Sequence, residues 1–289
     1  MFSIALAPLL FSVSAAFFFG ASVLTSKQGL RHVDAQTGSM ISIGTTVTIY
    51  TLVSPFFVKA EYWSSPGIWV FMANGLIHPM ISMAMSFEAT RRMGATVSST
   101  VSSTSPWFAT AGAVILLGES LSPFNLAGSL ATVLGVMLLI YDPGGTRSWK
   151  RADLLFALAA ATVRGSNNLI GKYGLGILPV PFMAAWLSFA VSLIGAVLVY
   201  RTRTGRLPLR LPRQGLRWFS MTGTLVGAAI LCMYSALSLG SVAVVSPVVA
   251  AFPLFTLALS LLLRQEIFSV KMLLGVLVVI TGIVLVGLK

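Results

Sequence analysis

The sequence predicts an all-α integral membrane protein in which ten transmembrane helices form two inverted five-helix repeats. Three observations lead to this prediction: the apolar composition, a series of apolar stretches of membrane-spanning length, and an internal repeat. Of the 289 residues, 56% are hydrophobic and 9% are charged, whereas soluble domains carry roughly 25% charged residues. A soluble fold of this length could not bury so much apolar surface, but lipid solvates apolar side chains and favours helices that satisfy their own backbone.

Ten apolar stretches have about the length that crosses a ~30 Å membrane core at ~1.5 Å per residue. The first runs from Met1 to Ser26 without a charged residue and has no basic residues ahead of it, so we expect an uncleaved first span. We expect the spans at residues 5–27, 38–58, 67–89, 95–117, 124–141, 152–174, 180–200, 216–237, 242–263 and 270–288. Because the connections are short, neighbouring helices should be antiparallel.

The net charge of +12 is compatible with nucleic-acid binding, but the positions of the basic residues indicate membrane orientation instead. Fifteen Lys and Arg residues fall on one side of the predicted spans, and only Lys59, Lys172 and Lys289 fall on the other. The positive-inside rule places the richer side in the cytoplasm and both termini outside. We expect the protein to lie in the cell membrane, either inner or plasma membrane, as a monomer or homodimer. The expected partners are the lipid bilayer and a small-molecule substrate, and we expect no nucleic acid to bind.

An internal repeat divides the chain into residues 1–145 and residues 146–289. Residues 97–138 match the residues 147 positions later at fourteen of forty-two positions. The matches include Pro106 with Pro253, Glu119 with Glu266, Gly128 with Gly275, and Gly135 with Gly282. A second block repeats after 145 positions and aligns Lys27 with Lys172. Five spans in each half is an odd number, so the second half enters the membrane from the opposite side, as in many secondary transporters.

Motifs at matching positions in the two halves carry a family resemblance. They are Phe19-Gly20 through Lys27 with its copy Gly165 through Lys172, and Ser105-Pro106-Trp107-Phe108 with its copy Phe252-Pro253-Leu254-Phe255. The ordered set covers almost the whole chain and resembles the EamA-like ten-span members of the drug/metabolite transporter superfamily. The resemblance implies a secondary carrier with a site between the halves. The sequence departs from the Trp-Gly pair frequent in that family, with Phe19-Gly20 and Arg164-Gly165 in its place.

Several repeated residues are expected to shape the helices or to couple transport to an ion. The pairs Gly128 with Gly135 and Gly275 with Gly282 each lie seven residues apart, on one helix face, where small residues let helices approach closely. Pro106 and Pro253 are expected in mid-helix, where each removes a backbone hydrogen bond and produces a kink or hinge. The coupling candidates are Glu119, Glu266, Lys27 and Lys172.

Polar residues near the middle of the spans are the substrate-binding candidates, because ionisable groups are costly there. Arg164 lies near the centre of span six, with Asn167 and Asn168 on the same helix face. His78 lies near the centre of span three, and Asn74 is one turn away on its face. The remaining candidates are Ser99 and Ser103 in a hydroxyl-rich run, and Tyr234.

No acidic residue falls near the centre of a predicted span, so the central cavity should be electropositive. The sequence therefore predicts an anionic or zwitterionic substrate, such as an amino acid or organic acid, whose carboxylate pairs with Arg164. Export is one direction compatible with this. The alternatives are a flippase or carrier of a lipid-linked or phosphorylated sugar, and a non-transporting membrane scaffold. We expect no enzymatic activity and no cofactor or metal, because the sequence has no nucleotide-binding loop or metal-ligand set.

Overall fold

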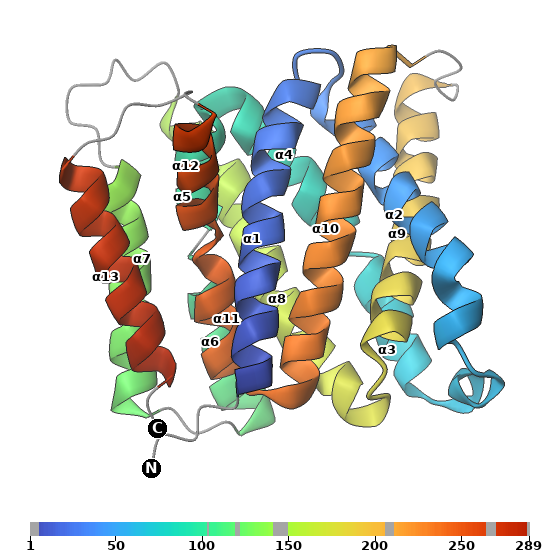
Figure 1. Ribbon diagram of the computed structural model, residues 1–289. Coiled ribbons are helices and arrows are strands. Elements are labelled where there is room, and N and C mark those ends of the chain that lie inside the picture. The colour runs from blue at the N-terminus through green and yellow to red at the C-terminus, as the bar shows by residue number, and fades with distance from the viewer. Residues whose placement is uncertain are drawn as a thin grey trace.

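A computed structural model describes residues 6–102, 104–118, 122–140, 150–205, 211–263 and 270–287. In these ranges the regular structure is helical (Figure 1). The helices of the first half are α1 (Leu6–Gly29), α2 (Ala35–Phe57), the 3-10 helix η1 (Ala60–Ser64), α3 (Gly67–Gly75), α4 (Met80–Met93), α5 (Ala95–Ser102), α6 (Ser105–Leu117) and α7 (Pro123–Ile140). Those of the second half are the 3-10 helix η2 (Arg151–Asp153), α8 (Leu154–Ile177), α9 (Pro181–Thr204), α10 (Arg213–Leu239), α11 (Val242–Ala250), α12 (Phe252–Leu262) and α13 (Val270–Gly287).

Six stretches of the described chain are long and apolar enough to cross a membrane. They are Leu6–Gly29, Ala35–Phe57, Gly67–Met93, Pro181–Thr202, Arg213–Leu239 and Val242–Leu262. Together with the helical fold, they are consistent with an integral membrane protein. The count of ten spans and the inverted repeat stay predictions.

Three of the expected spans are not continuous helices. The span expected at 67–89 is divided into α3 and α4, the one at 95–117 into α5 and α6, and the one at 242–263 into α11 and α12. Hydropathy averaged over a span does not detect these breaks, because only a few residues separate the paired helices.

Prolines mark the breaks and correct one expectation. Pro79 immediately precedes α4, while Pro106 and Pro253 lie in the first turns of α6 and α12, rather than in mid-helix. Proline lacks a backbone N–H, and the first turn of a helix is where that donor has no intrahelical acceptor. The two repeated prolines therefore begin new helices instead of kinking existing ones.

The helices run in opposite directions between two ends of the bundle. In the first turn of α10, Gly215 lies against the connection between α1 and α2. At the other end of α10, the following residue Gly240 lies beside Pro8, at the start of α1. The end that carries Lys27, Arg91 and Arg92 is called the basic end below. There, Arg92 of α4 pairs with Asp153 before α8 at 2.9 Å. The end that carries Lys172 is called the opposite end.

Two helix crossings in the bundle involve matching residues of the two halves. A Cβ atom on Gly20 of α1 would lie 2.7 Å from the Phe252 carbonyl oxygen of α12. A Cβ atom on Gly165 of α8 would lie 2.7 Å from the Ser105 carbonyl oxygen of α6. Only glycine permits backbones to approach this closely. The two crossings bring α1 against α12 and α8 against α6, at positions that the repeat aligns.

Helices α7 and α13 form a pair at one edge of the bundle (Figure 1). A Cβ atom on Gly135 would lie 2.7 Å from the backbone nitrogen of Val279 and 3.0 Å from the Gly275 carbonyl oxygen. A Cβ atom on Gly282 would similarly lie 2.7 Å from the Gly128 carbonyl oxygen. All four repeated glycines therefore lie in the contact between these two helices.

Gly135→Ala tests this contact. The added methyl group meets backbone atoms that cannot rotate away, so we expect a loss of about 1–3 kcal/mol in the free energy of unfolding. Gly176→Ala in α8 is the matched control, because a Cβ there would have nothing within 4 Å. Reversible unfolding in detergent micelles, followed by circular dichroism, measures both. Equal losses for the two variants would contradict the backbone contact.

Candidate functional site

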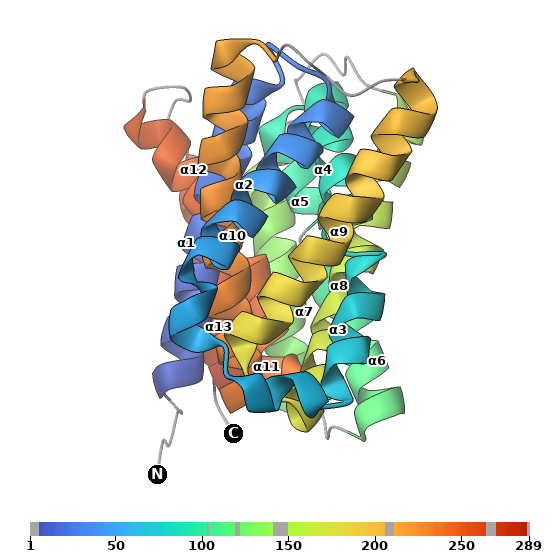
Figure 2. The same cartoon turned by 90° about the vertical axis from the view of Figure 1, so that its right-hand side faces the viewer.

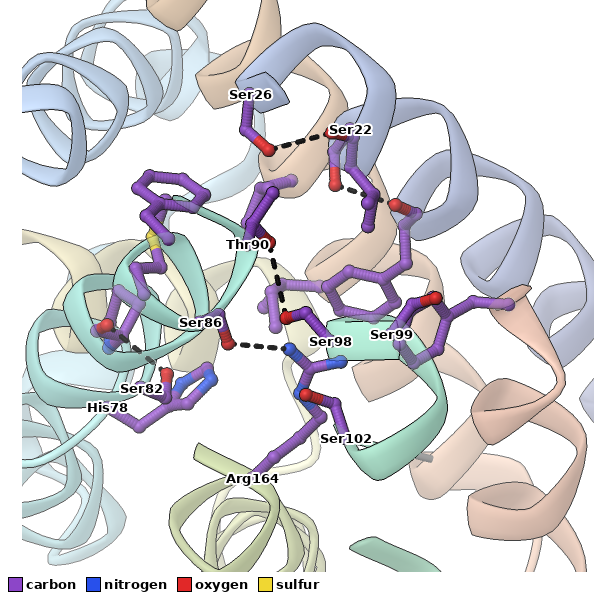
Figure 3. A pocket seen from close by; sticks show the side chains of 18 residues that line it. Ser22, Ser26, His78, Ser82, Ser86, Thr90, Ser98, Ser99, Ser102 and Arg164 are labelled. Carbon is purple, nitrogen blue, oxygen red and sulfur yellow. Dashed lines mark hydrogen bonds between the residues drawn. The ribbon is translucent and has the colours of Figure 1, made fainter. Parts of the chain in front are cut away.

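A small cavity lies inside the bundle, between helices α1, α4, α5 and α8 (Figure 3). Its volume is about 50 Å³, which admits a few water molecules but not a metabolite. Its apolar walls include Phe19, Val226, Ile230 and Phe252. Its polar lining consists of Ser22, Ser26, His78, Ser82, Ser86, Thr90, Ser98, Ser99, Ser102 and Arg164.

Arg164 places a cation in this cavity, next to two adjoining aromatic rings whose centres lie 6.3 Å apart. The central carbon of its guanidinium lies 5.4 Å from the centre of the Phe19 ring and 5.2 Å from that of Phe252. These rings attract the cation through their negative faces. One guanidinium nitrogen donates a long 3.4 Å hydrogen bond to Ser86 (Figure 3). Helices α1, α8 and α12 together therefore fix the position of the charge.

No carboxylate of the described residues is paired with Arg164. In that part of the chain, Lys59 pairs with Glu61 and Arg91 pairs with Glu88. Arg92 pairs with both Glu88 and Asp153. A guanidinium has five N–H donors, and a charge removed from bulk water is costly unless it is paired. The cavity thus contains a cation whose bonding capacity its protein neighbours do not fill.

One face of α4 presents polar groups to the cavity at every turn. Ser82, Ser86 and Thr90 of α4 follow one another at intervals of four residues, His78 precedes Ser82 by the same interval just before the helix, and all four line the cavity. Thr90 and Ser98 lie 3.2 Å apart through their hydroxyl oxygens. We call His78, Ser82, Ser86 and Thr90 the hydroxyl stripe; from the level of Arg164, its polar groups extend along the cavity toward the basic end. The sequence analysis does not identify Ser82, Ser86 and Thr90, although their four-residue spacing from His78 is visible in the sequence.

Three other predicted site residues bond to one another instead of lining the cavity. The Asn74 amide donates to the Asn167 side-chain oxygen at 2.7 Å and to the Tyr234 hydroxyl at 3.1 Å. The Tyr234 hydroxyl in turn donates to the Asn167 oxygen at 2.9 Å. Beside them, Asn168 donates to Ser246 at 2.8 Å. We call Asn74, Asn167, Asn168, Tyr234 and Ser246 the amide cluster; it joins α3, α8, α10 and α11.

Asn74 and His78 do not share a helix face, contrary to the sequence expectation. Helix α3 ends at Gly75 and α4 begins at Met80, so the turn between them sends the two side chains to different places. Asn74 enters the amide cluster, whereas His78 lines the cavity. The 3.6-residue periodicity used for the prediction requires an unbroken helix.

The amide cluster is incompletely bonded. Its residues are almost fully buried, yet the Asn74 side-chain oxygen, the Asn167 amide nitrogen and the Asn168 side-chain oxygen have no hydrogen-bond partner among the described residues. A buried polar atom without a partner costs about 1–3 kcal/mol. The cluster therefore seals the interior on the side of Arg164 away from the hydroxyl stripe, while retaining groups that would gain bonds on hydration or ligand binding.

The other predicted residues have the following places. Ser99 lines the cavity, and Lys172 donates to two carbonyl oxygens at the end of α10. Lys27 lies in the last turn of α1. Ser103, Glu119 and Glu266 lie outside the described residues. In the part of the chain that is described, no three His, Cys, Asp or Glu side chains are grouped as metal ligands.

Sequence comparison decides the family. The profile of the EamA-like transporter family matches residues 6–141 and, separately, residues 152–288. The chain belongs to the EamA-like transporter family. It is thus a multi-pass membrane transporter of the drug/metabolite transporter superfamily, and members of the EamA family are transporters rather than enzymes.

A solved structure shares the fold of this chain. One solved crystal structure superposes on the chain with a TM-score of 0.76 at 15% sequence identity, covering 96% of this chain and 95% of the other. At this identity the similarity concerns the fold alone. A comparison with curated protein sequences gives no match.

Tyr234→Phe tests the bonding of the amide cluster. The change removes the hydroxyl that accepts from Asn74 and donates to Asn167, so we expect the free energy of unfolding to fall by about 1 kcal/mol. Tyr173→Phe, on an exposed side chain of α8, is the matched control and should be neutral. Unfolding of both variants in detergent gives the comparison. A neutral Tyr234→Phe would show that the hydroxyl contributes nothing to the cluster.

Proposed function

We propose that this EamA-like protein is a secondary, alternating-access carrier of a small anionic or zwitterionic metabolite, such as an amino acid or organic acid. The observation that carries the proposal is the position of Arg164, a cation in an internal cavity that is paired with no carboxylate of the described residues. A substrate carboxylate can accept two parallel hydrogen bonds from a guanidinium. It would supply both the charge and the acceptors that Arg164 lacks.

The rest of the cavity lining favours the same substrate class. Hydroxyl groups from α1, α4 and α5 surround the position in front of Arg164, and hydroxyls donate readily to a carboxylate. The described lining residues include no Asp or Glu. A carrier of organic cations would need such an acid to compensate the substrate's charge.

The size of the cavity supports transport by conformational change. A volume of about 50 Å³ requires the helices to separate before a metabolite can enter. An inverted repeat supplies two related conformations for this, because exchanging the shapes of the halves moves the opening from one side to the other. The matching crossings of Gly20 with α12 and Gly165 with α6 support the repeat.

Orientation and location are part of the proposal. The basic end faces the cytoplasm, both termini lie outside, and the protein resides in the cell's inner or plasma membrane, where it would export its substrate. The excess of basic residues at one end supports the orientation.

A flippase for a lipid-linked or phosphorylated sugar is the second candidate, and a side groove is the observation relevant to it. A groove of about 700 Å³ lies between α2, α4 and α9, on the face that Figure 2 turns toward the viewer. Arg91 and Arg92 lie at its rim, but both are bonded to Glu88. The α4 residues that line the groove lie on the helix face opposite to the one that lines the cavity. The groove and the cavity share no lining residue. This separation favours a carrier of soluble metabolites.

Arg164→Gln in proteoliposomes tests the proposal. Purified protein is first screened for uptake of amino acids, organic acids, sugar phosphates and organic cations. For an anionic substrate, we expect the variant to lose at least about thirtyfold in uptake, since removing one partner of a buried charge pair costs about 2 kcal/mol or more. Arg213→Gln, at the exposed start of α10, is the matched control and should transport normally.

The outcomes separate the candidates. Uptake of organic acids or amino acids that depends on Arg164 supports the carrier proposal. Uptake of an organic cation, or anion uptake that persists in Arg164→Gln, contradicts it. Translocation of a labelled lipid-linked sugar supports the flippase. Absence of flux for every class, with the protein folded, favours a scaffold.

A further inference from the structure

Lys172 ties α8 to the end of α10. Its ammonium nitrogen donates to the carbonyl oxygens of Leu237 and Gly240, each at 2.8 Å. The last carbonyl groups of a helix lack intrahelical partners and carry the negative end of the helix dipole, so a lysine binds there favourably. One residue earlier, Gly171 lies against the Tyr234 ring of α10. Helices α8 and α10 are therefore joined at the opposite end.

The basic end contains the corresponding groups. Lys27 in the last turn of α1 precedes Lys172 by 145 positions. Helices α4 and α10 are each followed by a glycine that makes the same backbone bond: the Gly94 N–H donates to the Thr90 carbonyl at 2.9 Å, and the Gly240 N–H donates to the Ala236 carbonyl at 2.8 Å. Gly94 precedes Gly240 by 146 positions, and Thr90 precedes Ala236 by the same number. The counterparts of the Leu237 and Gly240 carbonyls are thus those of Arg91 and Gly94.

Lys27 does not bind those counterparts. In the part of the chain that the structure describes, its ammonium donates no hydrogen bond to α4. Ser26 of α1 and Thr90 of α4 instead both line the cavity. The side chains of Arg91 and Arg92 are bonded to Glu88 and Asp153, so a carboxylate neutralises each of them. The two ends of the bundle consequently differ: α8 is joined to α10, whereas the cavity lies between α1 and α4.

We infer that Lys172 and Lys27 are positioning residues that hold alternate ends of the carrier closed. In the conformation described, Lys172 closes the opposite end. When the carrier changes conformation, the Lys172 bonds break, α1 approaches α4, and Lys27 donates to the Arg91 and Gly94 carbonyls. This inference rests on the proposed alternating-access function. It gives the repeated lysines a role in setting the two conformations, separate from binding the substrate at Arg164.

The exchange keeps the two conformations close in free energy. Each conformation breaks two lysine–carbonyl bonds at one end and forms two of the same kind at the other. A carrier needs such a balance, because a large difference between its states would leave one of them almost unpopulated. Removing one lysine should therefore shift the population toward the state that the other lysine stabilises.

Cysteine accessibility measures this shift. In a Cys232→Ser background, Ser26→Cys reports on the cavity side near the basic end. Val245→Cys reports on the opposite end, because Val245 is fully buried and would lie 3.4 Å from a Cβ on Gly240. A membrane-impermeant maleimide is applied from each side of vesicles, and the ratio of the two labelling rates is compared with that of the parent.

The two lysine variants should act in opposite directions. With Lys172→Met we expect Val245→Cys to label faster and Ser26→Cys more slowly, changing the ratio by at least about tenfold, because two charge-assisted bonds are lost. With Lys27→Met we expect Ser26→Cys labelling to persist and Val245→Cys labelling to fall further. Both should slow uptake of the substrate found in the flux screen.

Lys59→Met is the matched control for charge at the opposite end, because Lys59 is exposed and pairs only loosely with Glu61 at 3.7 Å. It should change neither rate. Lys27→Met breaks no hydrogen bond in the described conformation, so it tests the inference even if Lys172→Met does not fold.

Two results would overturn the inference. One is faster labelling of Val245→Cys in Lys172→Met with no slowing of Ser26→Cys, which indicates a local structural role. The other is normal uptake and labelling in Lys27→Met. If either result occurs while uptake still depends on Arg164, the lysine inference is wrong and the proposed function stands.

Discussion

A guanidinium group inside an apolar bundle, with no carboxylate of the described part of the chain paired to it, is the constraint around which this structure is arranged. Arg164 is stabilised by the faces of Phe19 and Phe252, from helices at opposite ends of the sequence. Those rings can approach it because Gly20 and Gly165 let α1 and α8 pack closely against α12 and α6. The glycine crossings thus place the charge, and the charge defines the ligand chemistry of the cavity.

The polar groups on the two sides of Arg164 are bonded differently, and this difference connects helix packing to the proposed transport. Toward the basic end, hydroxyl groups line a small cavity. Toward the opposite end, the amide cluster and Lys172 join the helices. Within the part of the chain that the structure describes, three amide atoms of that cluster lack hydrogen-bond partners, so this end is bonded less completely than its polar groups allow.

Composition and repetition predict a helical membrane protein, and the ordered motifs of the two halves carry the resemblance to the EamA-like family. The cost of ionisable groups in mid-span singles out Arg164 and His78, which both line the cavity. These patterns could not predict the breaks at Pro79, Pro106 and Pro253, since averaged hydropathy is unaffected by a short turn. An unbroken helix would place Asn74 beside His78, whereas in the structure Asn74 bonds to Asn167 and Tyr234. The Phe19–Arg164–Phe252 arrangement depends on three helices meeting in space, which periodicity along one helix does not encode.

The most direct test of the central claim is a structure determined with a transported carboxylate bound. We predict that the carboxylate lies within hydrogen-bond distance of the Arg164 guanidinium, with Phe19 and Phe252 beside that guanidinium and hydroxyls of α4 or α5 around the carboxylate. A carboxylate bound elsewhere in the bundle, with Arg164 still unpaired or paired to an acidic side chain of the protein, would contradict the account.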